Sequence, residues 1–452
     1  GSRMSSSVHT GGLKPVLGLW GLVIFGISFV TPTAPFPMFG ILSSVSRGHM
    51  ALAYLIAFVA MLLTAVSYGR MASAFPAAGS AYSYVRHTLH PLAGFLVGWT
   101  MLLDYVLMPL LSVIYMALTI GHFFPVVPQG LLVVFFTLAI TALNLFGLKV
   151  TNRANLIMTA IMGAVVVWFV WVAVRALLSG VGEGTVFSLK PFYNPSRFGF
   201  SPVIGATSIA VFSFLGFDGI STLAEDAHDP RRNIGRATVL VCVITGFLFV
   251  LQAYLGQLAW PDYSTYPKTE TAFLDVSRRV GGGTLLGAVT FILMVAGIAS
   301  AVGGQASASR LLYGLGRDGI LPASVFAFVS PRFSTPTFSV LTIGLVTLIG
   351  GFCLTFQLAA EAVNFGAFIG FMGVNGSVIR HYFLRVKPRA HFLRNLLLPL
   401  AGFFVCFYIF ASLSATAKWI GVIWCVAGLA YMAFLTGGFR RRVSILGLED
   451  PS

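Results

Sequence analysis

The fold of this chain is decided by residues 26–37, which read GISFVTPTAPFP. They lie inside a long apolar run at residues 17–45, and three of them are prolines. A proline inside a helix removes a backbone donor and clashes with the preceding turn. The pattern therefore predicts a membrane helix that is broken near the middle of the bilayer.

A second interruption lies at residues 213–219, which read SFLGFDG, inside the apolar run at 200–225. It combines two glycines with an acidic residue. The two interrupted runs are five runs apart, so they occupy corresponding positions if runs 1–5 and 6–10 are the halves of an inverted repeat. Paired interrupted spans predict a substrate site near the midplane. Kinks that serve only helix packing are the alternative.

The composition indicates an all-α polytopic membrane protein. The chain has 452 residues, of which 57% are hydrophobic and 9% are charged, whereas soluble domains carry about 25% charged residues. Runs that are apolar on all sides predict helices and not barrel strands, which alternate apolar and polar residues. Long runs of this kind suggest about twelve spans. They lie near residues 17–45, 50–74, 92–121, 129–147, 155–178, 200–225, 234–258, 284–312, 337–356, 358–379, 396–414 and 418–438.

The charge distribution predicts the topology. The net charge of +15 arises from 28 Lys and Arg against 13 Asp and Glu. Most basic residues fall on one side if the span count is even and both termini are cytoplasmic, which fits the positive-inside rule without invoking nucleic acid. The tails are then residues 1–16, which begin with a tag scar before Met4, and residues 439–452.

Several function classes have no supporting motif. The sequence contains no G-x-x-x-x-G-K-[ST] phosphate loop and no H-E-x-x-H zinc motif, so we expect neither ATP-driven pumping nor metal-dependent proteolysis. No cofactor or metal site is predicted. A sensor, a channel or an integral enzyme remains the rival class, but no clustered nucleophile and base supports an enzyme.

Several stretches carry a family resemblance. They are residues 75–82 (FPAAGSAY), 98–105 (GWTMLLDY), 212–225, 309–313 with 316–318, and 364–367. In these the chain resembles the amino acid-polyamine-organocation permeases, and most closely the bacterial putrescine importers. The resemblance implies a LeuT-type fold with a 5+5 inverted repeat and broken helices 1 and 6.

In domain terms, the resemblance implies a ten-helix transport core at residues 17–383, with repeats at about 17–180 and 200–383. Two peripheral helices follow at residues 384–438. It also implies proton-coupled alternating access in an inner (plasma) membrane, with the surrounding lipid as a partner.

The first break bears on the substrate. Relatives that bind α-amino acids resemble one another in a small-residue G-S-G-type break, whose bare amides receive the α-carboxylate. Here the corresponding residues carry larger side chains, and Pro32 donates nothing. The pattern therefore favours a small amine over an amino acid. The candidate substrate residues in this break are Ser28, Val30, Thr31, Pro32 and Thr33.

The acids within the predicted spans point the same way. Asp104 lies about 12 residues, or roughly 18 Å, into the third span, where a carboxylate needs a partner such as a cation or a proton. Asp218 adjoins the second break and is a second candidate, although it could instead cap broken-helix amides. Asp104 has a structural alternative as a hydrogen-bonded acid of the bundle. With Glu225, these two acids are also the candidates for proton coupling or gating.

Aromatic and amide side chains complete the predicted pocket. Tyr105 and Phe214 could supply walls for an alkylammonium chain, as could Phe365 beside Asn364. Tyr105 is also favoured by its resemblance to the substrate-site tyrosine of the putrescine importers. The sequence thus predicts a secondary transporter for a putrescine-like amine. A permease for an amino acid or a γ-aminobutyrate-type zwitterion is the closest alternative.

Overall fold

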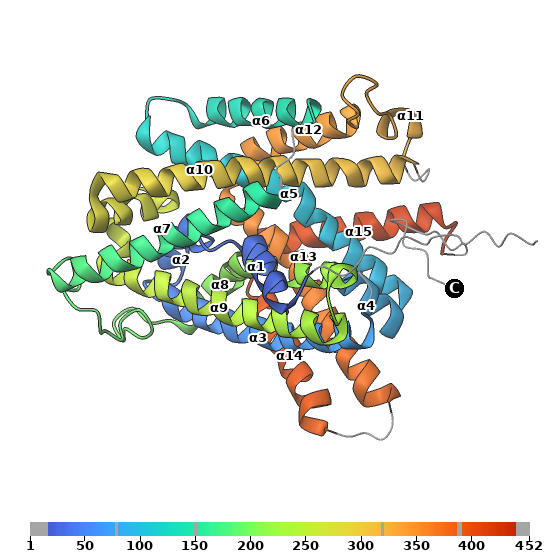
Figure 1. The fold of residues 1–452 in the computed structure, drawn as a ribbon, viewed down its shortest axis with the longest axis horizontal. Helices are drawn as coiled ribbons and strands as arrows, with labels where there is room; N and C mark the ends of the chain where they lie inside the picture. Colours follow the sequence, from blue (N-terminus) through green and yellow to red (C-terminus); the bar gives the residue numbers. More distant parts are fainter. Residues whose placement is uncertain (1–16, 77–79, 148–151, 318–320, 387–390, 440–452) are drawn as a thin grey trace, which may run out of the picture.

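The computed structural model describes residues 17–76, 80–147, 152–317, 321–386 and 391–439. These residues form helices, joined at one isolated β-bridge between Leu17 and Ala227. Figure 1 shows the long helices running side by side, with the short helices α1 and α8 in the middle of the bundle. The prediction of an all-helical membrane protein is therefore confirmed.

The described residues up to 178 form seven helices. The bounds are α1 (Leu19–Val30), α2 (Pro35–Val45), α3 (Met50–Ala74), α4 (Ser80–Thr88), α5 (Pro91–Phe123), α6 (Gln129–Leu145) and α7 (Asn152–Leu178). Helices α1 and α2 belong to one apolar run and meet at a bend of 57°. The predicted break in the first span is therefore confirmed.

The second part begins with the other interrupted run. Its elements are α8 (Phe200–Ala210), η1 (Val211–Phe214), η2 (Phe217–Asp226), α9 (Pro230–Ala259), η3 (Tyr263–Thr265), η4 (Thr269–Thr271), α10 (Ala272–Arg317), α11 (Ala323–Phe326), α12 (Thr337–Cys353) and α13 (Phe356–Val378). Gly282 interrupts α10 with a φ of 66°, so the residues before it form a separate short helix. The sequence analysis did not predict this extra helix.

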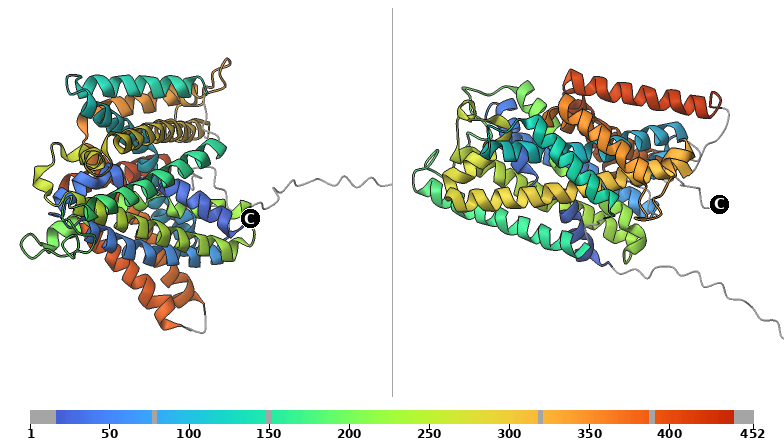
Figure 2. Two further views of the ribbon diagram at one scale, coloured as in Figure 1. Left: turned by 60° about the vertical axis from the view of Figure 1, so that its left-hand side comes forward. Right: turned by 90° about the horizontal axis from the view of Figure 1, so that it is seen from above.

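The described residues after α13 form two π-helical segments and two more long apolar helices. The π-helical segments η5 (Ile379–Arg385) and η6 (Leu393–Leu397) lead into α14 (Leu398–Ala411) and α15 (Ala415–Leu435). Figure 2 shows α15 at the outer edge of the bundle. Glu361 of α13 ties α15 to the core, because its buried carboxylate accepts a hydrogen bond of 2.8 Å from the amide of Ser414 at the start of α15.

Among the described residues, nine helices are long and apolar enough to cross a membrane, and the bent α1–α2 pair makes a tenth. Helices α6 and α12 are shorter but also apolar. Each of the twelve predicted runs therefore coincides with one of these elements. The packing uses small residues at close approaches. A Cβ atom on Gly69 of α3 would lie 2.9 Å from the Cα atom of Gly235 on α9.

Candidate functional site

The first break owes its shape to Thr31 and the prolines that follow. Thr31 ends α1 with a φ of 67°, a conformation that β-branched residues rarely adopt. Pro35 is the first residue of α2, where a missing amide hydrogen costs nothing. The prolines therefore start the second half-helix as well as ending the first. Gln252 of α9 holds the break, because its Nε2 donates to the carbonyl of Pro32 at 3.0 Å.

The second break passes directly beside the first. Gly216 follows η1 with a φ of 119°, and a Cβ atom there would lie 2.8 Å from the carbonyl carbon of Phe29. Only glycine allows this approach. Asn364 of α13 fixes α8, the first half of this span, since its Nδ2 donates to the carbonyls of Ser208 at 2.8 Å and Ile209 at 3.2 Å.

Two further contacts tie the broken spans to their surroundings. The hydroxyl groups of Tyr54 on α3 and Ser213 are 2.7 Å apart, which adds a polar tether at the second break. Just before α1 and just after η2, the amide of His228 donates to the carbonyl of Leu17 at 2.8 Å, next to the Leu17–Ala227 bridge. The ends of the two broken spans are thus joined directly.

A cavity of about 190 Å³ lies against both breaks. It is lined mainly by apolar side chains, together with hydroxyl groups from the first break, α5, η1 and α10. The polar groups are those of Thr31, Thr33, Ser112, Tyr115, Ser213 and Ser300, and the larger apolar side chains include Phe29, Met108, Leu111, Met162, Phe212, Leu293 and Phe356. This volume suits a small molecule of a few carbon atoms.

Asp104 lies one helical turn away from this cavity. Met108, Leu111 and Tyr115 of α5 line the cavity, and Asp104 shares their helix face because it precedes them by 4, 7 and 11 residues. Its Oδ1 atom is buried and has no hydrogen-bond partner among the described residues. Asp218 is near enough for the two carboxylates to repel each other.

Asp218 differs from Asp104 because it already has partners. Its Oδ1 accepts a hydrogen bond from the amide of Gly216 at 3.2 Å. The amides of Asp218 itself and of Gly219 also stabilise the charged form of this carboxylate. The carboxylate therefore caps the amides at the start of η2, where a negative charge is favourable. This is the capping role that the sequence left open as an alternative for this residue.

The structure brings most of the predicted site residues together around the breaks. Val30, Thr31 and Thr33 line the cavity, and the Thr33 hydroxyl contacts the Met162 sulfur at 3.3 Å. Ser28 and Phe214 are buried beside them, and Phe214 packs on Phe249.

Two predicted residues have other positions, and the side chain of a third is not described. Tyr105 is 44% exposed, and its hydroxyl is within electrostatic range of both acids. Phe365 points away from the breaks, with its ring 5.0 Å from that of Phe410 and packed against Gly421 of α15. The side chain of Glu225 lies outside the described part of the structure.

Sequence reasoning missed several residues that shape the site. Gln252 was detectable as an uncharged polar side chain inside the apolar run 234–258. Ser112 and Tyr115 were detectable from their helical spacing to Asp104. Met162 and Phe356 carried no such signal, because apolar residues fill every span and only packing selects these two.

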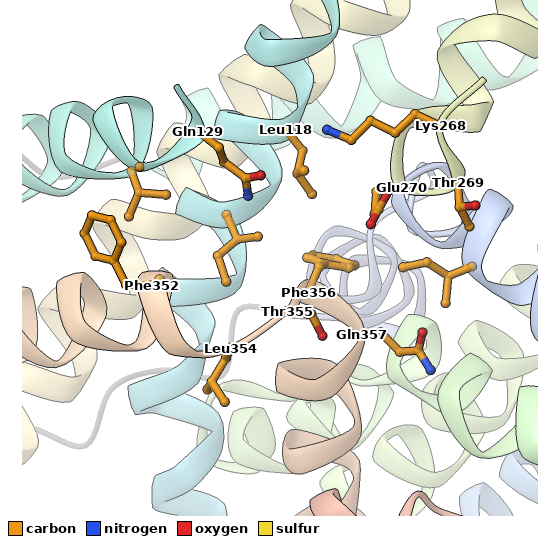
Figure 3. A pocket seen from close by; sticks show the side chains of 15 residues that line it. Leu118, Gln129, Lys268, Thr269, Glu270, Phe352, Leu354, Thr355, Phe356 and Gln357 are labelled. Atoms are coloured by element: carbon orange, nitrogen blue, oxygen red, sulfur yellow. The ribbon is translucent and has the colours of Figure 1, made fainter. Parts of the chain in front are cut away.

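A second, larger cavity of about 430 Å³ lies beyond Phe356, which lines both cavities. Figure 3 shows Lys268 extending over this second cavity towards Leu118 and Gln129. Glu270 also lines it. Phe356 therefore lies between this second cavity, which has polar lining residues, and the cavity at the breaks.

Comparisons with known proteins match the chain along nearly its whole length. The family model for amino acid permeases matches residues 21–441. The low-affinity putrescine importer PlaP of Escherichia coli K12 is 34% identical over 438 residues, which cover 95% of this chain and 96% of that protein. The branched-chain amino acid permease BcaP of Bacillus subtilis is 25% identical and covers 92% of each chain. A methylthioribose transporter of the same species is 26% identical and covers 95% of each.

Proposed function

Because this chain belongs to the amino acid permease family, we propose that it takes up a small organic amine of the putrescine type by alternating access. As a permease it is a membrane transporter and not an enzyme. Its substrate is a small amine or amino acid, as the names of the putrescine importer and the branched-chain amino acid permease imply. The choice of an amine within that range is the proposal.

The observation that carries the proposal is the kind of polar atom left without a partner. Within the described residues, the buried unpartnered atoms near the breaks include Asp104 Oδ1, Gln252 Oε1, Asn364 Oδ1 and the hydroxyl of Tyr115. The amide oxygens and the ionised Asp104 carboxylate only accept hydrogen bonds, whereas the hydroxyl can accept or donate. A diammonium ion brings N–H donors and no acceptor. Such an ion would satisfy these oxygens, whereas a carboxylate would add further acceptors.

The amide groups of the first break support the same choice. The amide of Thr31 donates to Ile27 O at 2.9 Å, and that of Ala34 donates to Thr31 O at 3.3 Å. Pro32 has no amide hydrogen. The amides of Thr31 and Ala34 are therefore already hydrogen-bonded within the break, and Pro32 has no amide hydrogen to offer a carboxylate.

The test is competition between putrescine and ornithine in proteoliposomes. The two molecules have similar carbon chains and differ by one carboxylate. A carboxylate desolvated without donors costs several kcal/mol, and even about 2.8 kcal/mol corresponds to roughly a hundredfold difference in affinity. Putrescine should compete with labelled substrate about a hundredfold better. Equal competition by ornithine would replace the amine proposal with an amino acid one.

The second candidate is a permease for an amino acid or a γ-aminobutyrate-type zwitterion. The name of the Bacillus relative, a branched-chain amino acid permease, favours it. Including γ-aminobutyrate and leucine in the same competition series separates these cases, because each keeps a carboxylate that putrescine lacks.

We further propose that transport is coupled to protons, with Asp104 as the group that takes up either the proton or the amine. The unpartnered buried oxygen of Asp104 supports this role. Accumulation should follow an imposed pH gradient and should persist without sodium. Uptake that requires sodium and does not depend on the pH gradient would contradict proton coupling through Asp104.

The proposed architecture has twelve spans in a LeuT-type 5+5 arrangement, set in a plasma membrane with both termini on the cytoplasmic side. The paired breaks in α1–α2 and in α8–η2 support it. Single cysteines at positions Ser80 and Ser444 should resist an impermeant thiol reagent in intact cells. Labelling of either one from outside would overturn this topology.

A further inference from the structure

The segment between α13 and α14 forms a feature that transport does not explain. Its two arms, η5 and η6, stand out from the flank of the bundle (Figures 1 and 2). The arms contact each other through Phe383 and Phe392, whose ring centroids are 6.0 Å apart. We call residues 379–386 and 391–397 the basic hairpin.

The described residues of the basic hairpin include three arginines, Arg380, Arg385 and Arg394, and no acid. The nearest acids along the chain are Glu361 and Glu449. Arg385 and Arg394 of the hairpin are both exposed. Among the described residues, neither of these two arginines forms an ion pair. The hairpin therefore presents positive charge that the protein itself leaves unneutralised.

Arg70 of α3 extends this charge to the base of the hairpin. Its guanidinium group lies 4.1 Å from the ring centroid of Tyr382, and its Nη2 donates to the side chain of Asn395. Arg394 is near enough to repel Arg70. The Nη1 atom of Arg70 is buried and has no partner among the described residues. An anion at this point would accept a hydrogen bond from Nη1 of Arg70 and would reduce the repulsion between Arg70 and Arg394.

The surface of the hairpin is apolar next to this charge. Its exposed large apolar side chains are Leu384, Val386, Phe392, Leu393 and Leu397. In water such a set would be unfavourable on a projecting hairpin, whereas the boundary between headgroups and acyl chains suits it. Guanidinium groups match phosphate oxygens through paired hydrogen bonds.

We propose that the basic hairpin and Arg70 form a site for an acidic phospholipid. Arg70, Arg385 and Arg394 hold the headgroup phosphate, and the apolar side chains contact the acyl chains. The site lies on the flank of the bundle, on elements that do not line the cavity at the breaks. It is therefore separate from the proposed amine site.

The experiment is native mass spectrometry of the purified full-length protein with added phosphatidylglycerol or phosphatidylcholine of the same acyl chains. The wild type should retain phosphatidylglycerol in preference. The double variant Arg385→Gln, Arg394→Gln should bind it roughly 25-fold more weakly, at about fivefold for each surface arginine removed. The matched control Lys190→Gln, Arg332→Gln removes the same charge from exposed positions elsewhere and should bind it like the wild type.

Further arms distinguish a lipid from other occupants. Leu393→Ser keeps the charges and should still weaken retention of phosphatidylglycerol, because it removes an acyl-chain contact. Inorganic phosphate alone should bind far more weakly than the lipid. Equal retention of the two lipids by the wild type would overturn the proposal, as would phosphate binding as tight as that of phosphatidylglycerol. A dimer that the double variant abolishes, without lipid retention, would assign the hairpin to a second copy of the chain.

Discussion

Replacing Asp104 by asparagine separates a functional acid from a structural one. The Oδ1 atom of Asp104 has no partner among the described residues, so in the unliganded protein this carboxyl gains little from its surroundings. A hydrogen bond to a charged group contributes about 1.5–3 kcal/mol. If an ammonium group of the substrate makes that bond, Asp104→Asn should weaken putrescine binding by about 10- to 150-fold.

The same substitution should not destabilise the protein. A buried carboxylate without a partner is costly, so its neutral isostere should leave the thermal stability unchanged or raise it. Lost substrate binding together with retained stability is typical of a residue that destabilises the folded protein but is needed for binding.

Asp218→Asn is the matched comparison, because it removes the same charge from the neighbouring acid. Backbone amides already satisfy Asp218. Its replacement should lower stability by about 1–3 kcal/mol and change putrescine competition less than Asp104→Asn does. The assays are competition in proteoliposomes and thermal unfolding in detergent. Equal losses of putrescine binding in the two variants, or unfolding of Asp104→Asn, would refute this assignment of roles.

Three other predictions follow from contacts outside the acid pair. Gln252→Leu should lower stability by about 1–3 kcal/mol in thermal unfolding, because it leaves the buried Pro32 carbonyl without its donor. Glu361→Gln should cost about 1 kcal/mol, because a neutral acceptor replaces the carboxylate at the start of α15; an unchanged unfolding temperature would contradict this role. In the loop between α9 and α10, the side chain and amide of a neighbouring serine hold the pKa of Asp262 below its usual value. The protection factors for hydrogen exchange in that loop, which are corrected for the intrinsic pH dependence of exchange, should therefore stay constant as the pH falls to about 4 and decrease only below it.

The membrane fold could be predicted from the sequence because its signals are local. An apolar run of sufficient length must form a helix in lipid, since no water satisfies its backbone there. The prolines near residue 32 and the glycine at 216 act on their own backbone, so the two breaks were also visible in the sequence. The helices that were missed among the described residues are α4, α11 and the helix before Gly282, and all three are too short to resemble a span.

The resemblance added what composition could not, namely the transporter class and the list of candidate substrate residues. The family match agrees with the class. The individual residues stay predictions, and the structure separates them by position. Asp104 and Asp218 looked alike in the sequence, as two acids at similar depth. Their hydrogen bonds distinguish them, because only Asp218 lies where a broken helix offers free amides.

What the sequence determined by itself is the set of spans and the positions of the breaks, because both follow from the solvent preference and the backbone freedom of nearby residues. The tertiary structure alone decided which side chains meet. Asn364 and Gln252 each donate to the carbonyl groups of a break more than 150 residues away, while Phe365, next to Asn364, turns its ring towards Phe410. On a helix, neighbouring residues differ in direction by about 100°, so only the packing of the other helices determines which of them faces the site.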